Sequence, residues 1–190
     1  MNAMCLVQST PGHFAQFMPS QHNRIIPLQK MNLWQEFLKK CDKYSNIHHT
    51  TNENKAFCCD YKDLFKTDSL KNIDTIYLDS PYSQEQYSRF YHILETVVKY
   101  DNPVVNFKAK YRENRFLSGF CYKSKVEKEF VNIFDFCRTN NINLVISYSN
   151  KAVFPINKLE NLCKQYFKCV NRQDINYNHS TQVIITSESF

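Results

Sequence analysis

A carboxylate, a hydroxyl, a proline and a phenol ring follow one another at Asp79, Ser80, Pro81 and Tyr82. The Asp79 carboxylate and the Ser80 backbone carbonyl can each accept an N–H bond from the exocyclic amine of a planar base, and the Tyr82 ring offers a face for stacking. Two such acceptors favour the change of the amine nitrogen from planar to tetrahedral, which it needs before it attacks a methyl group. These four residues therefore predict a site for a planar base that bears an exocyclic amine.

The neighbouring pattern places this quartet at the end of a buried strand. Residues 73–79 form an apolar run that leads straight into the proline-containing turn, which is typical of a strand. Residues 87–98 carry apolar side chains at intervals of three and four, and this spacing predicts a helix that stops before Pro103. Because ligands bind beyond the carboxyl ends of strands in open α/β sheets, Asp79 stands where chemistry is expected.

The rest of the chain alternates helices with strands. Side-chain caps predict helix starts at Asn32, at Ser124 with Glu127, and at Asn157 with Glu160. We expect strands at residues 56–59, 142–148, 166–170 and 181–187, and the polar residues 171–180 suit a hairpin connection between the last two.

This alternation predicts an α/β fold with a mostly parallel sheet, helices on its faces and a C-terminal antiparallel hairpin at one edge. Residues 1–30 contain three prolines and little periodicity, so we expect an irregular N-terminal arm there. Residues 31–190 are expected to form a single domain with a substantial core.

Composition narrows the classes of function. Lys and Arg number 24 against 18 Asp and Glu, and this basic excess permits a polyanionic partner. The chain has two glycines, so the glycine-rich phosphate loops of the dinucleotide fingerprint and the P-loop are excluded. The eight cysteines form no C-x-x-C pair, so no zinc site is indicated. No apolar run approaches the ~20 residues needed to cross a bilayer, and we expect a cytoplasmic protein with no membrane partner.

Several ordered segments resemble the Dam-like, D12 class DNA N6-adenine methyltransferases. Asp79–Tyr82 looks like the D-P-P-Y motif of that family, and residues 77–92, YLDSPYSQEQYSRFYH, are similar to its "YLDPPY…QYS…YH" segment. Residues 112–123 resemble the basic loop that follows in the family, and Ser147–Ser149 matches its "SYS" strand ending. Asp60 and Tyr61 fall where the family has an acidic and an aromatic residue that hold the adenine of the cofactor.

The resemblance implies a partial Rossmann-like sheet and S-adenosylmethionine as cofactor. It implies a site-specific, adenine-specific DNA methyltransferase of a restriction-modification system, which methylates N6 of an adenine flipped out of double-stranded DNA. The implied catalytic residues are Asp79, Ser80, Pro81 and Tyr82, and the implied cofactor-binding residues are Asp60, Tyr61 and Asp79. An Asp after a short strand also commonly caps the next turn, so for Asp60 both readings stay open.

A basic loop follows the quartet and its helix. Lys108, Lys110, Arg112 and Arg115 are interleaved with aromatic residues, which favours contact with DNA phosphates over a merely exposed turn. Tyr87 is close enough in sequence to line the adenine pocket, although aromatic residues at helical spacing commonly face the core.

Two departures from the family bear on activity. Ser80 stands where the family usually has its first proline, and it can still offer its backbone carbonyl. The family's "F-x-G-x-G" cofactor loop has no counterpart in the sequence. We therefore expect the carboxyl-terminal catalytic portion of a longer enzyme, in a truncated or split chain. The alternatives are a non-catalytic DNA-binding remnant and a subunit whose partner, a separate chain, carries the loop.

Overall fold

A computed structural model describes residues 30, 32–45, 54–106, 111–177 and 180–189 of the 190. The chain divides into two compact units, and each is described by itself: Met1–Asn54 with Tyr87–Phe116, and Lys55–Gln86 with Leu117–Phe190. The expected arm at residues 1–30 lies outside the described residues except for residue 30. The single domain expected over residues 31–190 stays a prediction.

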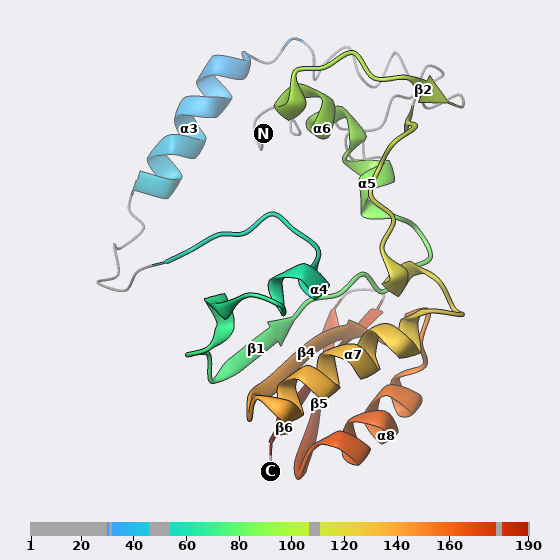
Figure 1. Cartoon of the computed structure of the whole chain (residues 1–190). Helices are drawn as coiled ribbons and strands as arrows, with labels where there is room; N and C mark the ends of the chain where they lie inside the picture. Colours follow the sequence, from blue (N-terminus) through green and yellow to red (C-terminus); the bar gives the residue numbers. More distant parts are fainter. Residues whose placement is uncertain (1–29, 31, 46–53, 107–110, 178–179, 190) are drawn as a thin grey trace. The chain divides into compact units, whose positions relative to one another are not determined.

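A four-stranded sheet organises the second unit (Figure 1). Its strand order is β1 (Thr75–Leu78), β4 (Asn143–Ser149), β6 (Ser180–Glu188), β5 (Cys169–Tyr177). The β1–β4 pair is parallel, whereas β4–β6 and β6–β5 are antiparallel. The fold is therefore mixed α/β, and among the described residues the sheet is mixed rather than mostly parallel. The expected C-terminal antiparallel hairpin at the sheet edge is confirmed.

Two strand predictions were wrong in detail. Residues 56–59 are exposed and form no strand, because no described strand pairs with them. The polar residues 171–177, expected in the hairpin connection, continue β5 in register with β6. β5 is an edge strand, and its residues 171–176 are exposed to solvent, so it accommodates polar side chains.

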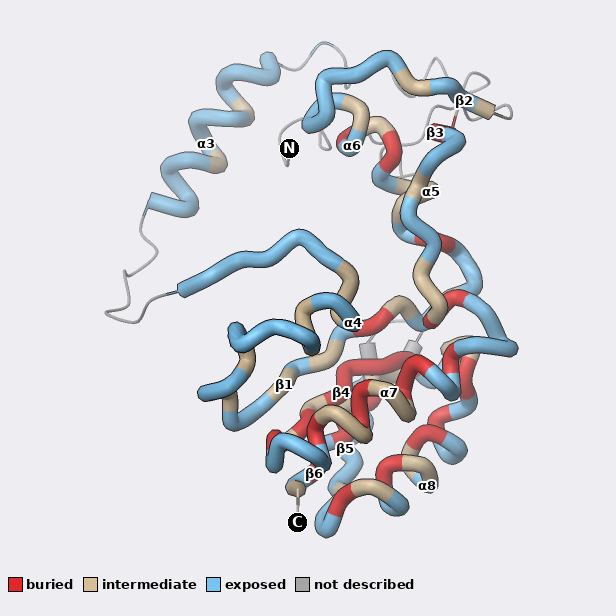
Figure 2. Tube along the Cα trace, in the orientation of Figure 1, coloured by how far each residue is buried: buried red, intermediate tan, exposed pale blue. Residues whose placement is uncertain are grey.

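The core of the second unit lies between the sheet and two helices, α7 (Val126–Thr139) and α8 (Ile156–Tyr166). Figure 2 shows the buried residues gathered on β4, α7 and α8. Phe130 and Phe134 follow the i, i+4 spacing of one buried face of α7, and each makes an edge-on contact: Phe130 with Tyr148 of β4, Phe134 with Phe167. This aromatic packing fixes β4 and thereby its parallel neighbour β1.

The starts of α7 and α8 differ from the predicted capping boxes. Lys125 is the N-cap of α7 and makes no side-chain cap bond, because its ammonium group has no acceptor. The carbonyl of Tyr122 accepts the backbone N–H groups of Lys125 and Val126 at 3.0 and 2.9 Å. Pro155, whose ring fixes φ at a value suited to a helix start, precedes α8. The boxes at Ser124 with Glu127 and at Asn157 with Glu160 were therefore wrong.

The first unit contains α3 (Leu33–Ser45), α5 (Tyr87–Phe90), α6 (His92–Lys99) and the short pair β2 (Val105–Asn106) and β3 (Tyr111–Arg112). Asn32 Oδ1 accepts the backbone N–H groups of Trp34 and Gln35 at 3.0 and 3.2 Å, so the predicted Asn cap of α3 is confirmed. The single helix expected over residues 87–98 is interrupted at Tyr91, whose ψ of 11° leaves helical geometry. Tyr100, at φ 49°, ends α6.

Three short elements complete the described structure: α4 (Tyr61–Leu64), η2 (Asp68–Leu70) and η3 (Gly119–Cys121). No helix within the described residues has the length and apolarity that membrane crossing requires.

Candidate functional site

The quartet Asp79–Tyr82 directly follows the last residue of β1 in the second unit. Asp79 is exposed, the Tyr82 ring is 40% exposed, and Ser80 between them is 4% exposed. The Ser80 hydroxyl is buried and has no hydrogen-bond partner among the described residues. The Ser80 side chain, which stands where the family has a proline, thus makes no hydrogen bond with the described residues. Asp79 and Tyr82, the residues predicted to contact the base, are exposed to solvent.

A backbone bond fixes the far end of the quartet. The N–H of Val153 donates to the carbonyl of Tyr82 at 2.8 Å. Val153 lies in the loop after β4 and packs against the hydrophobic core. Because β1 and β4 are parallel, with Leu78 opposite Ile146, both loops leave the same edge of the sheet. The core therefore positions Tyr82 through the loop that follows the neighbouring strand.

A second anchor lies four residues further on, at Gln86. Its side-chain Nε2 donates to the carbonyl of Ser118 at 3.1 Å, and its Oε1 accepts the Ser118 N–H at 2.7 Å. The Cys121 thiol donates to the carbonyl of Glu85 at 3.4 Å. Gln86 is buried, so these bonds compensate for its loss of water and tie the motif segment to η3. Sequence reasoning assigned Gln86 no role, although it lies within the matched "QYS" string.

Asp60 and Tyr61, the predicted cofactor residues, make structural contacts in the second unit. Asp60 Oδ1 accepts the backbone N–H of Lys62 at 2.9 Å as the N-cap of α4. The Tyr61 hydroxyl donates to Glu129 Oε2, and its ring packs edge-on against Phe65. Burial and the bond to Glu129 raise the pKa of Tyr61, so the phenol stays protonated. Their contact with a cofactor stays a prediction.

Glu129 is the buried charge that sequence reasoning missed. Lys62 Nζ lies 2.7 Å from Glu129 Oε2, and the Glu129 side chain is 10% exposed. A Cβ on Gly119 would clash with the Glu129 carboxylate, so a larger residue at this position would displace that side chain. The sequence indicated the burial of Glu129, because Glu129 lies three residues after Val126 on the apolar stripe of α7.

The predicted DNA-binding residues belong to the first unit. Lys108 and Lys110 lie outside the described residues. Tyr87 is exposed and meets Tyr91 edge-on at 6.3 Å between ring centroids. Arg115 is half-buried, with its guanidinium 5.8 Å from the centroid of the Tyr111 ring. The DNA contacts of all these residues stay predictions.

Arg112, also predicted to contact DNA, is held by a carboxylate of its own unit. Its side chain is 7% exposed, and two guanidinium nitrogens donate to the two carboxylate oxygens of Asp101 at 2.5 Å each. A third bond joins it to Thr96 Oγ1 at 3.0 Å. The hydrogen bonds from Arg112 lower the pKa of Asp101, so the pair stays charged. This bidentate pair joins β3 to the residues that follow α6.

Comparison with known proteins agrees with the motif. The family model for D12 class N6 adenine-specific DNA methyltransferase matches residues 23–162. Modification methylase LlaI of Lactococcus lactis subsp. lactis is 38% identical over 93 residues, which cover 49% of this chain and 15% of that protein. Modification methylase StsI of Streptococcus sanguinis is 28% identical over 140 residues, which cover 68% of this chain and 21% of that protein. Type II methyltransferase M.FokI of Planomicrobium okeanokoites is 30% identical over 96 residues, which cover 49% of this chain and 14% of that protein.

No solved structure gave a significant match. The chain spans between 14% and 21% of the length of these three relatives, and the family model covers most of the chain. The chain belongs to the family of D12 class N6 adenine-specific DNA methyltransferases.

Proposed function

We propose that this chain carries the catalytic motif of a site-specific DNA methyltransferase. The enzyme transfers a methyl group from S-adenosylmethionine to N6 of an adenine flipped out of double-stranded DNA, as part of a restriction-modification system. One observation carries the proposal: the exposed Asp79 carboxylate and Tyr82 ring leave the carboxyl end of β1 on a segment that is anchored at Tyr82 and at Gln86. Membership of the family does not favour a non-catalytic DNA-binding remnant.

The chemistry of the quartet follows from its hydrogen-bond acceptors. The adenine N6 amine donates one N–H to the Asp79 carboxylate and one to the Ser80 carbonyl, while Tyr82 stacks on the ring. These bonds draw the nitrogen lone pair out of conjugation with the ring, so that it can attack a methyl carbon. With S-adenosylmethionine bound, the N–C bond would form as the carbon–sulfur bond breaks and the thioether leaves, and the proton released from N6 would pass to solvent water. Asp79 stabilises the positive charge on N6 during the transfer.

The described residues offer part of a site for S-adenosylmethionine, which when bound supplies an electrophilic methyl group. Asp79 is exposed at the strand end and can accept from the amine of the cofactor. Asp60 is half-buried and uses one carboxylate oxygen for the α4 cap, which leaves the other for a cofactor hydroxyl or amine. The phenol of Tyr61 already bonds Glu129, so its ring rather than its hydroxyl is the part suited to the cofactor.

The rest of the cofactor site is proposed to come from a segment with the F-x-G-x-G loop, on a separate chain. The free edge of β1 supports this proposal, because β1 is the end strand of the sheet and pairs only with β4 among the described residues. The Tyr77 side chain on β1 is 62% exposed. An unpaired apolar edge is a ready site for another strand.

Labelled S-adenosylmethionine and adenine-containing duplex DNA test the proposed function. The chain is assayed alone and with a second chain that carries an F-x-G-x-G loop, and the DNA is then digested to nucleosides. We expect label in N6-methyladenine when both chains are present. Folded protein that transfers no label in either mixture would contradict the proposal.

A further inference from the structure

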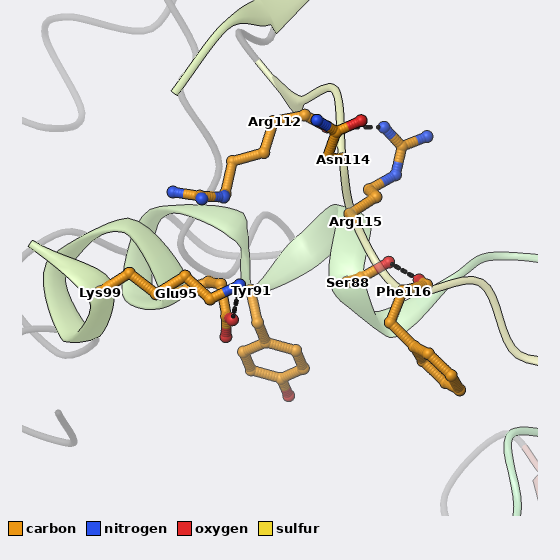
Figure 3. A pocket seen from close by; sticks show the side chains of 8 residues that line it. All are labelled: Ser88, Tyr91, Glu95, Lys99, Arg112, Asn114, Arg115 and Phe116. Atoms are coloured by element: carbon orange, nitrogen blue, oxygen red, sulfur yellow. Dashed lines mark hydrogen bonds and ion pairs between the residues drawn. The ribbon is translucent and has the colours of Figure 1, made fainter. Parts of the chain in front are cut away.

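A small pocket lies within the first unit, to which the quartet does not belong. It is lined by residues of α5, α6 and the turn between them on one side and by residues from the end of β3 and the segment that follows it on the other (Figure 3). Its volume is about 140 Å³. Pockets for drug-sized ligands start at roughly 300 Å³, so this one suits a single small group rather than a whole cofactor or nucleotide.

The charges of the lining favour an anion. Lys99, Arg112 and Arg115 line the pocket, and Glu95 is the one carboxylate among the lining residues. Asp101 does not line the pocket, but it neutralises Arg112 and fixes the orientation of its side chain. Arg112 is therefore a positioning residue and is not counted among the cations that would bind the anion. The remaining cations are Lys99 and Arg115.

Neither remaining cation is firmly held by the protein. Lys99 Nζ lies 2.8 Å from Glu95 Oε1, but both side chains are about half exposed, and such surface pairs contribute little. Arg115 donates from one terminal nitrogen to the carbonyl of Arg112, and its Nε is buried without a hydrogen-bond partner among the described residues. A buried donor of this kind calls for an acceptor that the described residues do not supply.

The surroundings of the pocket are electrically positive. His92, buried against the Tyr111 ring, has a pKa below its usual value, chiefly because of burial and further because Arg115 and Arg112 repel its proton. The rim carries aromatic rings: the Tyr91 side chain is 44% exposed and that of Phe116 is 64% exposed. Positive charge beside exposed rings is the usual composition of a surface that follows a nucleic-acid backbone.

We propose that this pocket binds one phosphate of the DNA backbone, with Arg115 and Lys99 as its cations and the Asn114 amide as a neutral donor. The inference rests on the proposed function, because DNA is taken as the polyanion. It adds Lys99, Asn114 and the face of α6 to the DNA contact and assigns Arg112 to positioning. Glu95 opposes the phosphate and holds Lys99 when DNA is absent.

The full chain and a short fluorescent duplex test this site by anisotropy over a series of salt concentrations, without cofactor. Each lost phosphate contact lowers the slope of log affinity against log salt by about 0.9. We expect Arg115→Gln and Lys99→Gln each to weaken binding and reduce the slope, and the double variant to reduce it by about that amount in total, because both cations serve one phosphate. Glu95→Gln is expected to tighten binding, because it removes a repulsive charge and frees Lys99.

Two matched controls come from the second unit, on helices α8 and α7. Lys164 is paired with Glu160 at i, i+4, like Lys99 with Glu95, and Arg138 lies 5.2 Å from the Tyr166 ring centroid, like Arg115 over Tyr111. Lys164→Gln and Arg138→Gln each remove one positive charge and should leave the slope unchanged. Circular dichroism checks that each variant folds.

The outcomes separate this inference from the proposed function. Pocket variants that bind with the parental slope, a Glu95→Gln variant that does not bind more tightly, or a chain with no affinity for DNA would overturn the phosphate site. Slopes that change as expected in a chain that never methylates DNA would support the phosphate site and contradict the proposed function. Methylation of DNA by the pocket variants with unchanged salt slopes would support the proposed function and contradict the phosphate site.

Discussion

The two units are stabilised by different interactions. In the second unit, buried apolar residues of α7, α8, β4 and β6 form one cluster around Phe130 and Phe134. In the first unit the four buried residues that the structure describes are Leu94, His92, Tyr111 and Arg112, of which one is aliphatic. Tyr111 is contacted there by the guanidinium of Arg89 at 4.9 Å and by the ring of His92 at 5.1 Å.

The difference matches the tasks proposed for the two units. Catalytic groups need a fixed geometry, and a close-packed apolar core holds the loops around Asp79 with little sensitivity to salt. Contact with DNA needs positive charge, and a unit built on ion pairs and cation–π contacts presents it. We expect the second unit to respond mainly to lost volume and the first unit mainly to salt and pH.

The largest expected effect is on the apolar unit. Phe130→Ala removes a fully buried ring that contacts Phe120, Tyr148 and Phe154, and should lower the free energy of unfolding by about 3–5 kcal/mol. Urea unfolding measures this loss. The exposed Phe116→Ala is the control, and an equal loss in both variants would remove the contrast between core and surface.

A smaller effect is expected at the contact between η3 and α7. Gly119→Ala places a methyl group against the Glu129 carboxylate, which Tyr61 and Lys62 hold in place, and should cost about 1–3 kcal/mol. Urea unfolding of the single variant and of Gly119→Ala with Glu129→Ala measures the coupling. If the double variant recovers none of the loss, the clash with Glu129 is not its cause.

In the polar unit, Asp101→Asn should loosen the joint between β3 and α6. The substitution keeps the shape of the side chain but removes the charge that Arg112 contacts with two nitrogens. Hydrogen exchange should then accelerate at the amides of residues 92–100 and 111–115. Asp135→Asn, in the exposed pair of Asp135 with Arg138 at 3.4 Å, is the control, and similar exchange in both variants would argue against a structural role for the Arg112 pair.

The smallest effect is a pH dependence from His92. Its pKa is lowered in the folded protein, so the neutral form is the native one and the unfolded chain takes up the proton first. The contribution of His92 to stability is therefore complete above about pH 6.5 and is lost as the pH falls toward the folded-state pKa. Urea midpoints between pH 7.5 and pH 5 should fall less steeply in His92→Gln than in the parent. Parallel curves would show that His92 does not titrate as proposed.

The sequence predicted the elements with strong periodicity and missed those set by tertiary contacts. The α7 stripe was predicted because its apolar pattern matches its burial. The strand before Asp79 was found from its apolar run, but the expectation that it is buried was wrong, because β1 is the end strand of the sheet and none of its four residues is buried. The terminal hairpin was predicted from its two β-prone segments. The capping boxes failed because Tyr122 and Pro155 set the helix starts instead. Residues 56–59 are apolar enough for a strand, but a strand also needs a partner, which local sequence does not specify.

The candidate site divides in the same way. The order of the quartet and its place after β1 were readable from the residues, and so was the family. The anchors were not, because Gln86 bonds Ser118 and Tyr82 bonds Val153 across 32 and 71 residues of sequence. The pairing of Arg112 with Asp101 was missed for a similar reason, since a basic loop gives no sign of which of its cations is buried.

The central claim is that the turn after β1 grips the adenine amine, and Asp79→Asn tests it most directly. The single-turnover rate of methyl transfer and the DNA affinity are measured for the parent and the variant, each with the loop-bearing chain present. We predict that the rate falls by about 10²–10³-fold, the usual cost of losing one preorganised electrostatic contact, while the DNA affinity changes little. A variant that methylates adenine at the parental rate would contradict the account.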